Sequence, residues 1–316
     1  MHNRIEEYIE QLIPTFLGMG VSLADQKEIE YGYQLVLTQL DQVCTMALYH
    51  SEKKGLSVVL GGKKTTRLYQ EMEDLISTNP PSGSTSNLPF HNWGSWIGSD
   101  ESGKGDYLGC LVVCAFHVDN TISRDLIKIG VRDSKLNNNE RNTEIASNLM
   151  SRYPERIACI VLKPLKYNEI YEAMAKEKKN LNDLLAWQHK QAIIQLSDRI
   201  NNLDGILVDQ FSKSMKTKKL ISRSKLTCPV VERPHAESDL AVASASIIAR
   251  YSFLAMQKKM SDHYKLEFPF GANRNAEKAA GKFIQKYGVT RLNEVAKLNF
   301  RTTAKVMQTE LELNNT

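Results

Sequence analysis

The chain has 316 residues, of which 42% are hydrophobic and 24% are charged, so it is long enough for two ordinary globular domains. Its net charge of +5 is uneven, because residues 1–80 hold 7 basic against 11 acidic side chains and the remainder hold 34 against 25, a weak indication of a phosphate-bearing partner. No apolar run approaches a membrane span and no basic and apolar leader begins the chain, which argues against a membrane or secreted protein and predicts a cytoplasmic one.

Five cysteines are scattered through the chain, mostly within apolar runs. They are Cys44, Cys110, Cys114, Cys159 and Cys228. Their odd number is simplest to explain by buried thiols in a reducing compartment. Because no Cys-x-x-Cys pattern and no histidine cluster accompanies them, we expect no zinc site.

The first part of the chain, residues 1–80, predicts a small α+β domain. Residues 5–13 carry apolar side chains at helical spacing, and residues 31–48 predict a strand followed by a helix. Residues 55–62 predict a strand that ends in a turn, and residues 65–76 predict a second helix.

Basic side chains flank the strand predicted at residues 55–62. Lys53 and Lys54 precede the strand, and Lys63 and Lys64 follow it. These lysines are either solvated turn residues or an edge that contacts phosphates.

The stretch that separates this domain from the rest of the chain has the composition of a linker. Residues 77–92 are rich in serine, proline, asparagine and threonine. We therefore expect a first domain at 1–80, a linker at 81–93 and a second domain at 94–316.

Residues 97–116 predict a strand, a tight turn and a second strand. Asp100 and Glu101 are adjacent near the end of the first strand, so their side chains point to opposite faces and one of them lies near the interior. Gly103 and Gly105 leave room for another backbone to approach the turn. The stretch is therefore either a hairpin whose acids cap its turn or part of a chemical site.

Two further acids follow in comparable positions. The apolar run 205–209 is typical of a buried parallel strand and ends in Asp209, at the carboxyl end where open α/β sheets place their ligands. Residues 239–260 predict a long helix with small residues on one side, which allows close packing. Glu237 lies at the start of this helix, where it either complements the helix dipole or contributes to a site.

Four carboxylates thus stand at strand ends or helix starts. They are Asp100, Glu101, Asp209 and Glu237. Hard divalent cations prefer oxygen ligands, and two-metal hydrolysis of a phosphodiester requires several carboxylates to converge. Each acid alone has a structural role as the alternative, whereas their shared placement predicts a metal site.

The run Gly98–Gly109 resembles the first catalytic motif of the type 2 ribonucleases H, and its Gly-Lys-Gly turn is similar to that of the ribonuclease HIII branch. Similar motifs follow in the family's order between residues 94 and 305. They are Arg132-Asp-Ser-Lys135, Val208-Asp-Gln-Phe211, His235-Ala-Glu237, Ala243-Ser-Ala-Ser-Ile-Ile-Ala-Arg250, Phe268-Pro-Phe-Gly271 and Ala296-Lys-Leu-Asn-Phe300. Several ordered motifs make the resemblance specific. Residues 48–63 are similar, less specifically, to the N-terminal extension of the HIII branch.

The resemblance implies an α/β fold with a ribonuclease H-like mixed sheet flanked by helices, preceded by a small substrate-binding domain similar to the TATA-box-binding-protein fold. It implies that the four carboxylates are the family's Asp-Glu-Asp-Glu metal ligands, with Asp239 as a competitor for the fourth place. We also expect a set of residues to contact the substrate. They are Gly103, Lys104, Gly105, Ser134, Lys135, Lys63 and Lys64. For Ser134 a helix cap is the alternative role.

The function that the resemblance implies is hydrolysis of the RNA strand of RNA–DNA hybrids by a monomer with Mg²⁺ or Mn²⁺, leaving 5′-phosphate and 3′-hydroxyl ends. One alternative is cleavage at single embedded ribonucleotides, as in ribonuclease HII, which the Gly-Lys-Gly turn and the extension argue against. The other is a hybrid-binding module without activity. Such a module would be expected to have lost one of the four acids, and none is lost.

Overall fold

The computed structural model describes residues 3–51, 55–78, 91–131 and 139–314. The chain divides into two compact units, Met1–Pro89 and Phe90–Thr316, and each unit has a hydrophobic core of its own. Most of the predicted linker, residues 81–90, lies outside the described residues.

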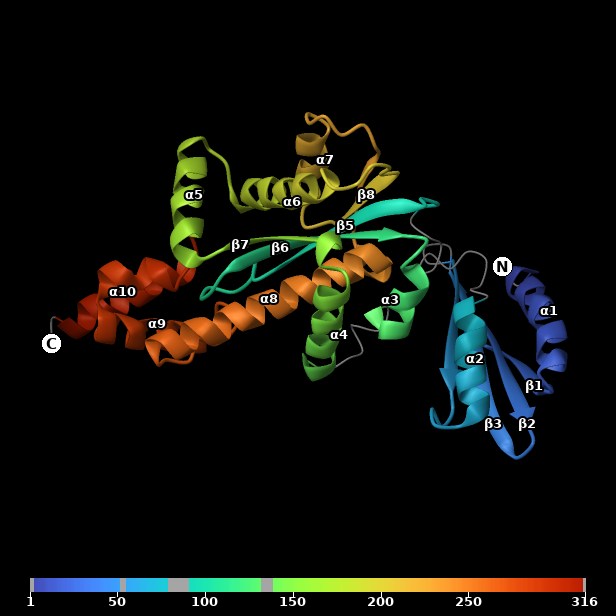
Figure 1. Ribbon diagram of the computed structural model, residues 1–316. Coiled ribbons are helices and arrows are strands. Elements are labelled where there is room, and N and C mark those ends of the chain that lie inside the picture. The colour runs from blue at the N-terminus through green and yellow to red at the C-terminus, as the bar shows by residue number, and fades with distance from the viewer. Residues whose placement is uncertain (1–2, 52–54, 79–90, 132–138, 315–316) are drawn as a thin grey trace. The chain divides into compact units, whose positions relative to one another are not determined.

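The first unit combines a four-stranded antiparallel sheet with two helices, which confirms the predicted α+β character (Figure 1). Its elements are α1 (Asn3–Gly18), β1 (Ser22–Ile29), β2 (Gly32–Gln39), β3 (Gln42–Ser51), β4 (Gly55–Gly61) and α2 (Arg67–Thr78). The strands lie in the order β1-β2-β3-β4. Apolar side chains of both helices, such as Phe16 and Leu68, belong to one core with Leu35, Met46 and Leu56 of the sheet.

The helix predicted in the second half of residues 31–48 is wrong, because this segment forms the hairpin of β2 and β3. Gln39 pairs with Gln42, so the turn consists of Leu40 and Asp41, and Leu40 adopts a left-handed φ of 54°. Buried side chains alternate along both strands, as at Cys44 and Met46. This period of two is typical of a strand with one buried face.

The second unit is built on a mixed sheet, as predicted, and this sheet has five strands in the order β7-β6-β5-β8-β9. Strands β5, β8 and β9 are parallel to one another, whereas β6 pairs antiparallel with both of its neighbours, β5 and β7. The strands are β5 (Ser95–Ser102), β6 (Leu111–Asp119), β7 (Ile157–Leu162), β8 (Gly205–Asp209) and β9 (Val230–Arg233). The helices are α3 (Ser123–Ile129), α4 (Asn139–Arg152), α5 (Pro164–Lys176), α6 (Leu181–Ser197), α7 (Lys216–Ile221), α8 (Leu240–Tyr264), α9 (Arg274–Tyr287) and α10 (Arg301–Asn314), with short 3₁₀ turns at Pro154–Arg156, Ala236–Ser238 and Val289–Glu294.

Helix α6 covers one face of this sheet and α8 runs along the other (Figure 1). The residues of β6 alternate between the two cores: Cys114 and Phe116 pack on the α8 side, and Val113 and Ala115 pack on the α6 side. The whole strand is therefore apolar, as expected for a strand that is buried on both faces.

The expectation that no apolar run approaches a membrane span is corrected by helix α8, which is long and apolar enough to cross a membrane by length and composition alone. Its buried side chains, among them Ala245, Ile248 and Phe253, belong to the core that includes β6 and α4. The apolar composition is therefore that of a central core helix.

Cys114 and Cys159 form a disulfide, which corrects the prediction that all five cysteines are thiols. The two residues are direct partners in the β6–β7 register, with Cα atoms 4.2 Å apart. They are 45 residues apart in the sequence, and only the strand pairing brings them together. Cys44, Cys110 and Cys228 are free.

The C-terminal part of the second unit is joined to the segment after β5 by a buried lysine. The Lys297 ammonium donates hydrogen bonds to the carbonyl oxygens of Gly109 at 2.9 Å and Cys110 at 3.3 Å. Burial lowers the pKa of Lys297 to about 8. Leu108 also forms a bridge with Ala296, so the motif at residues 296–300 supports the turn that follows β5.

Candidate active site

Asp100 and Glu101 lie near the end of β5 and point to opposite faces of the sheet. The Asp100 carboxylate interacts with Ser246 of α8 and accepts the Glu101 backbone N–H at 2.7 Å. The Glu101 carboxylate contacts His189 of α6, with Oε2 3.2 Å from Nε2. Asp100 thus contacts the helix on one face of the sheet and Glu101 contacts the helix on the other face, as expected for adjacent residues of a strand.

Asp209 ends β8, the parallel neighbour of β5, and this topology brings it to the same edge of the sheet. Its Oδ1 accepts the backbone N–H of Ala236 at 2.9 Å, and its carboxyl is hydrogen-bonded to Glu237. Asp209 also interacts electrostatically with Asp100 and Glu101. The structure therefore brings together all four acids that the sequence nominates.

Glu237 and Asp239 have different environments, which separates their roles. Glu237 lies in the short turn Ala236–Ser238 with its side chain 18% exposed. Asp239 is the N-cap of α8: its Oδ1 accepts the N–H groups of Ala241 at 2.9 Å and Val242 at 3.1 Å. The Trp96 indole also donates to Asp239. Asp239 is therefore engaged as a helix cap, and Glu237 is the acid that joins the cluster.

Burial and neighbouring carboxylates raise the pKa of two members of the cluster, Asp100 and Asp209. Burial raises the pKa of Asp100 to about 7, and the neighbouring Glu101 and Asp209 carboxylates add to this effect. Burial likewise raises the pKa of Asp209 to about 6, with a further contribution from Glu237. A cluster of desolvated acids that destabilise one another's charge is expected where a cation binds.

Glu101 differs from its neighbours because cationic groups surround it. Burial alone would raise its pKa, but the hydrogen bond and charge of His189, together with Lys104, outweigh burial and lower the pKa below the usual value. The Lys104 ammonium lies 3.5 Å from Oε1 of Glu101 and 5.3 Å from the centre of the Phe211 ring. The surroundings of Glu101 therefore favour its ionised form, in contrast to those of Asp100 and Asp209.

The donor set fits a hard divalent cation. All four side chains offer carboxylate oxygens, the ligand type that Mg²⁺ and Mn²⁺ prefer. Within the described ranges, however, no group of three or more His, Cys, Asp and Glu side chains is already arranged to hold a metal ion. The cluster therefore supplies ligands of the right chemical type for such a cation.

The glycine turn after β5 is fixed to the C-terminal part of its unit. Gly103 adopts a left-handed φ of 91°, and a side chain there would lie 2.3 Å from the Cys110 carbonyl oxygen. Asp106 accepts the Gly271 N–H at 2.6 Å, and the Tyr107 N–H donates to the Gly271 oxygen at 3.0 Å. Gly271, at the end of the motif at residues 268–271, therefore anchors the turn that the sequence nominates for substrate contact.

The remaining nominated residues are not brought to this cluster by any described contact. Ser134 and Lys135 fall at residues 132–138, outside the described residues. Lys63 and Lys64 are exposed in the first unit, between β4 and α2, where Thr66 bonds back to the Lys63 carbonyl oxygen. Their proposed contact with substrate stays a prediction.

Two side chains that hold the acids were not nominated from the sequence. Ser246 falls within the motif at residues 243–250 and only the structure shows that it faces Asp100. His189 lies on α6, 88 residues from Glu101, among apolar positions that give no sign of a polar role. No periodicity in the sequence could have found it.

A family model described as ribonuclease HII matches residues 97–303, which include all four carboxylates. Fold, carboxylate cluster and match together define a nuclease of the ribonuclease H class. A ribonuclease HIII of Bacillus pumilus is 33% identical over 276 residues, which cover 83% of this chain and 85% of the relative. A ribonuclease HIII of Protochlamydia amoebophila is 34% identical over 211 residues, 67% of this chain and 68% of the relative. The chain belongs to the ribonuclease HIII family.

Solved structures agree with this assignment over almost the whole chain. A crystal structure of Bst-RNase HIII in complex with Mn²⁺ is similar with a TM-score of 0.66 and 29% identity, covering 95% of this chain and 96% of that one. The ribonuclease H2 of Pyrococcus horikoshii has a TM-score of 0.57 at 21% identity and covers 68% of this chain and 98% of that one, which shows a shared fold.

Proposed function

We propose that the chain hydrolyses the RNA strand of RNA–DNA hybrids by two-metal-ion phosphodiester cleavage, leaving 5′-phosphate and 3′-hydroxyl ends. The observation that carries the proposal is the cluster of Asp100, Glu101, Asp209 and Glu237, whose carboxyls interact and whose central members have raised pKa values. Membership of the ribonuclease HIII family, and the Mn²⁺ complex of a similar protein, support it.

The four carboxylates would hold the divalent ions. When bound, such ions supply activation of the attacking water and stabilisation of the leaving oxygen. Asp100 and Asp209, from neighbouring parallel strands, approach the site from the sheet, and Glu237 approaches from the turn before α8. The sheet edge fixes the backbone positions from which Asp100 and Asp209 approach the site, and so limits the reorganisation that binding requires.

The glycine turn would position the RNA strand beside the carboxylates. Backbone amides of Gly103 and Gly105 suit phosphate oxygens and ribose hydroxyls, and Lys104 offers a charge to a phosphate. The 2′-hydroxyl is the group that distinguishes the RNA strand from DNA. The Lys104 position is defined by Glu101 and by the Phe211 carbonyl oxygen, 3.3 Å away.

A labelled RNA–DNA hybrid tests the proposal after the protein has been freed of metal with a chelator. We expect cleavage within the RNA strand, with 5′-phosphate products, only when Mg²⁺ or Mn²⁺ is added. A DNA duplex of the same sequence is the control, and a duplex with one ribonucleotide tests for ribonuclease HII-like specificity. Cleavage without metal, or none with either ion, contradicts the proposal.

We further propose that the first unit binds the hybrid through its basic edge. Lys63 and Lys64 are both exposed after β4 and suit phosphate contacts. Replacing both with glutamine is expected to raise KM for the hybrid roughly tenfold, with kcat unchanged, because two phosphate contacts are lost. Lys27→Gln, an exposed lysine of β1, is the control in steady-state kinetics. A double variant with the KM of that control refutes the role of this edge.

A further inference from the structure

His189 is a polar side chain placed in an apolar layer, and its contacts lead to the active site. It lies on α6 with its side chain 0% exposed, and nearby members of that core include Leu185 and Ile193. Burying an imidazole is costly unless its nitrogens are hydrogen-bonded. Both nitrogens have partners: Nδ1 is 2.7 Å from the Ser99 hydroxyl oxygen, and Nε2 is 3.2 Å from Oε2 of Glu101.

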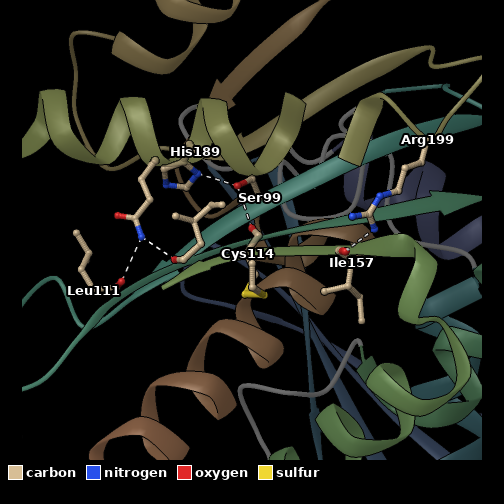
Figure 2. Close-up of a disulfide and its surroundings, with 9 residues drawn as sticks. Ser99, Leu111, Cys114, Ile157, His189 and Arg199 are labelled. Carbon is tan, nitrogen blue, oxygen red and sulfur yellow. Dashed lines mark hydrogen bonds between the residues drawn. A yellow bond between two sulfur atoms is a disulfide. The ribbon is translucent and has the colours of Figure 1, made fainter. Parts of the chain in front are cut away.

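The orientation of the ring follows from an account of the hydrogens. Ser99 lies between the His189 ring and the main chain of Cys114, whose sulfur points to the opposite face of the sheet (Figure 2). The Ser99 hydroxyl oxygen lies within hydrogen-bond distance of both the Cys114 carbonyl oxygen, at 3.0 Å, and Nδ1 of His189. Because the Glu101 carboxylate only accepts hydrogen bonds, Nε2 must carry the hydrogen of the His189–Glu101 bond.

Packing fixes the ring further. The Phe211 ring stacks on the imidazole, with centroids 5.2 Å apart and planes inclined by 15°. Phe211 follows Asp209 by two residues. The segment that carries Asp209 therefore also packs on His189, which contacts Glu101. Lys104 lies on the other oxygen of Glu101, so both carboxylate oxygens have a partner.

A histidine that merely fills the core would not need this alignment. Its hydrogen bonds would be expected to go to the nearest main-chain groups, as those of the adjacent Gln188 do with the carbonyl oxygens of Leu111 and Ile160. His189 instead connects the strand backbone, through Ser99, to one carboxylate of the cluster. Partners of this kind typically change metal affinity 10- to 100-fold when they are removed.

We propose that His189, oriented by Ser99, is a positioning residue that fixes the Glu101 carboxylate in the orientation needed to bind a divalent ion. The inference rests on the proposed function, because it assigns a role in the same metal site. His189 does not touch the reacting atoms in this assignment. It acts by limiting the rotation of one ligand.

The test compares His189→Leu, His189→Gln and Ser99→Ala by Mn²⁺ calorimetry, thermal unfolding and hybrid cleavage at saturating Mn²⁺. His189→Leu is expected to weaken Mn²⁺ binding by roughly 10- to 100-fold and to lower kcat, with KM for the hybrid unchanged. His189→Gln keeps an N–H donor near the position of Nε2 and is expected to recover most of the affinity. Ser99→Ala is expected to lie between the two.

His117→Leu is the matched control. His117 is also buried and bonded to a serine of β5, Ser95 at 2.9 Å, but its other described contact is Arg156 and not an acid of the cluster. This variant is expected to lose stability while keeping the Mn²⁺ affinity and kcat of the wild type. The comparison separates the loss of a buried histidine from the loss of a positioned carboxylate.

The inference is overturned if His189→Leu folds and binds Mn²⁺ as tightly as the wild type, or if His189→Gln is as impaired as His189→Leu. Should His189→Leu fail to fold, a wild-type Mn²⁺ affinity in both Ser99→Ala and His189→Gln overturns it. A wild-type protein that binds no Mn²⁺ and cleaves no hybrid contradicts the proposed function itself. That outcome differs from the one that overturns only the inference, in which the wild type is active and replacing His189 leaves Mn²⁺ affinity unchanged.

Discussion

Asp100→Asn is expected to reduce hybrid cleavage by roughly 1000-fold or more and to stabilise the metal-free protein. The loss of activity follows because an amide is a poor ligand for a hard cation and removes one negative charge from the cluster. The gain in stability follows because burial and two neighbouring carboxylates raise the pKa of Asp100 to about 7, so its ionised form is disfavoured in the fold.

The pH dependence has a definite sign. Because the pKa of Asp100 is higher in the folded than in the unfolded chain, its contribution to stability is complete below about pH 4 and is lost as the pH rises to about 7. Asparagine does not titrate. In chelator, the stability advantage of Asp100→Asn should therefore be larger at pH 8 than at pH 5, reaching about 2 kcal/mol after a discount for partial exposure.

Thermal unfolding at both pH values, with and without Mn²⁺, measures this effect. Mn²⁺ should stabilise the wild type more than the variant, because ligand binding to the folded state adds stability. Asp262→Asn, an exposed acid of α8, serves as the control and should show neither effect. Wild-type cleavage by Asp100→Asn would remove Asp100 from the metal site.

The placement of the four acids close together could be predicted from the sequence because it depends on local rules. The alternation of side chains along a strand separates Asp100 from Glu101, and the end of an apolar run marks Asp209. The choice between Glu237 and Asp239 could not be made in this way. It depends on the left-handed φ of 59° at His235, which starts a short turn and leaves Asp239 to cap α8.

Other features depend on contacts between distant segments and were therefore not predicted. The disulfide requires the register that places Cys114 opposite Cys159. The β2–β3 hairpin has Leu40-Asp41 at its turn and lacks the Asn-Gly or Asp-Gly signal that usually marks such turns. His189 stands at an ordinary core position of a helix. Its role follows from where α6 packs on the sheet.

Gly98→Ala is expected to have the second large effect, through the contact between β5 and α8. A Cβ atom at Gly98 would lie 2.2 Å from the backbone nitrogen of Val242 and 2.3 Å from the carbonyl carbon of Ala241. Both are main-chain atoms of the helix, so no side chain can rotate away and α8 itself must move. Overpacking of this kind costs about 3 kcal/mol, a large share of the stability of a typical domain.

The displacement would also reach the active site, because the same helix carries Ser246 against Asp100 and is capped by Asp239. Gly98→Ala should therefore lower the midpoint of urea unfolding and weaken Mn²⁺ binding together. Gly105→Ala is the matched control for stability, since an added Cβ there meets nothing within 4 Å. An unfolding midpoint for Gly98→Ala equal to that of Gly105→Ala would show that α8 does not depend on this close approach. If instead both the unfolding midpoint and the Mn²⁺ affinity fall, the absence of a side chain at Gly98 sets the distance between β5 and α8. That distance then determines how well α8 positions Ser246 against Asp100.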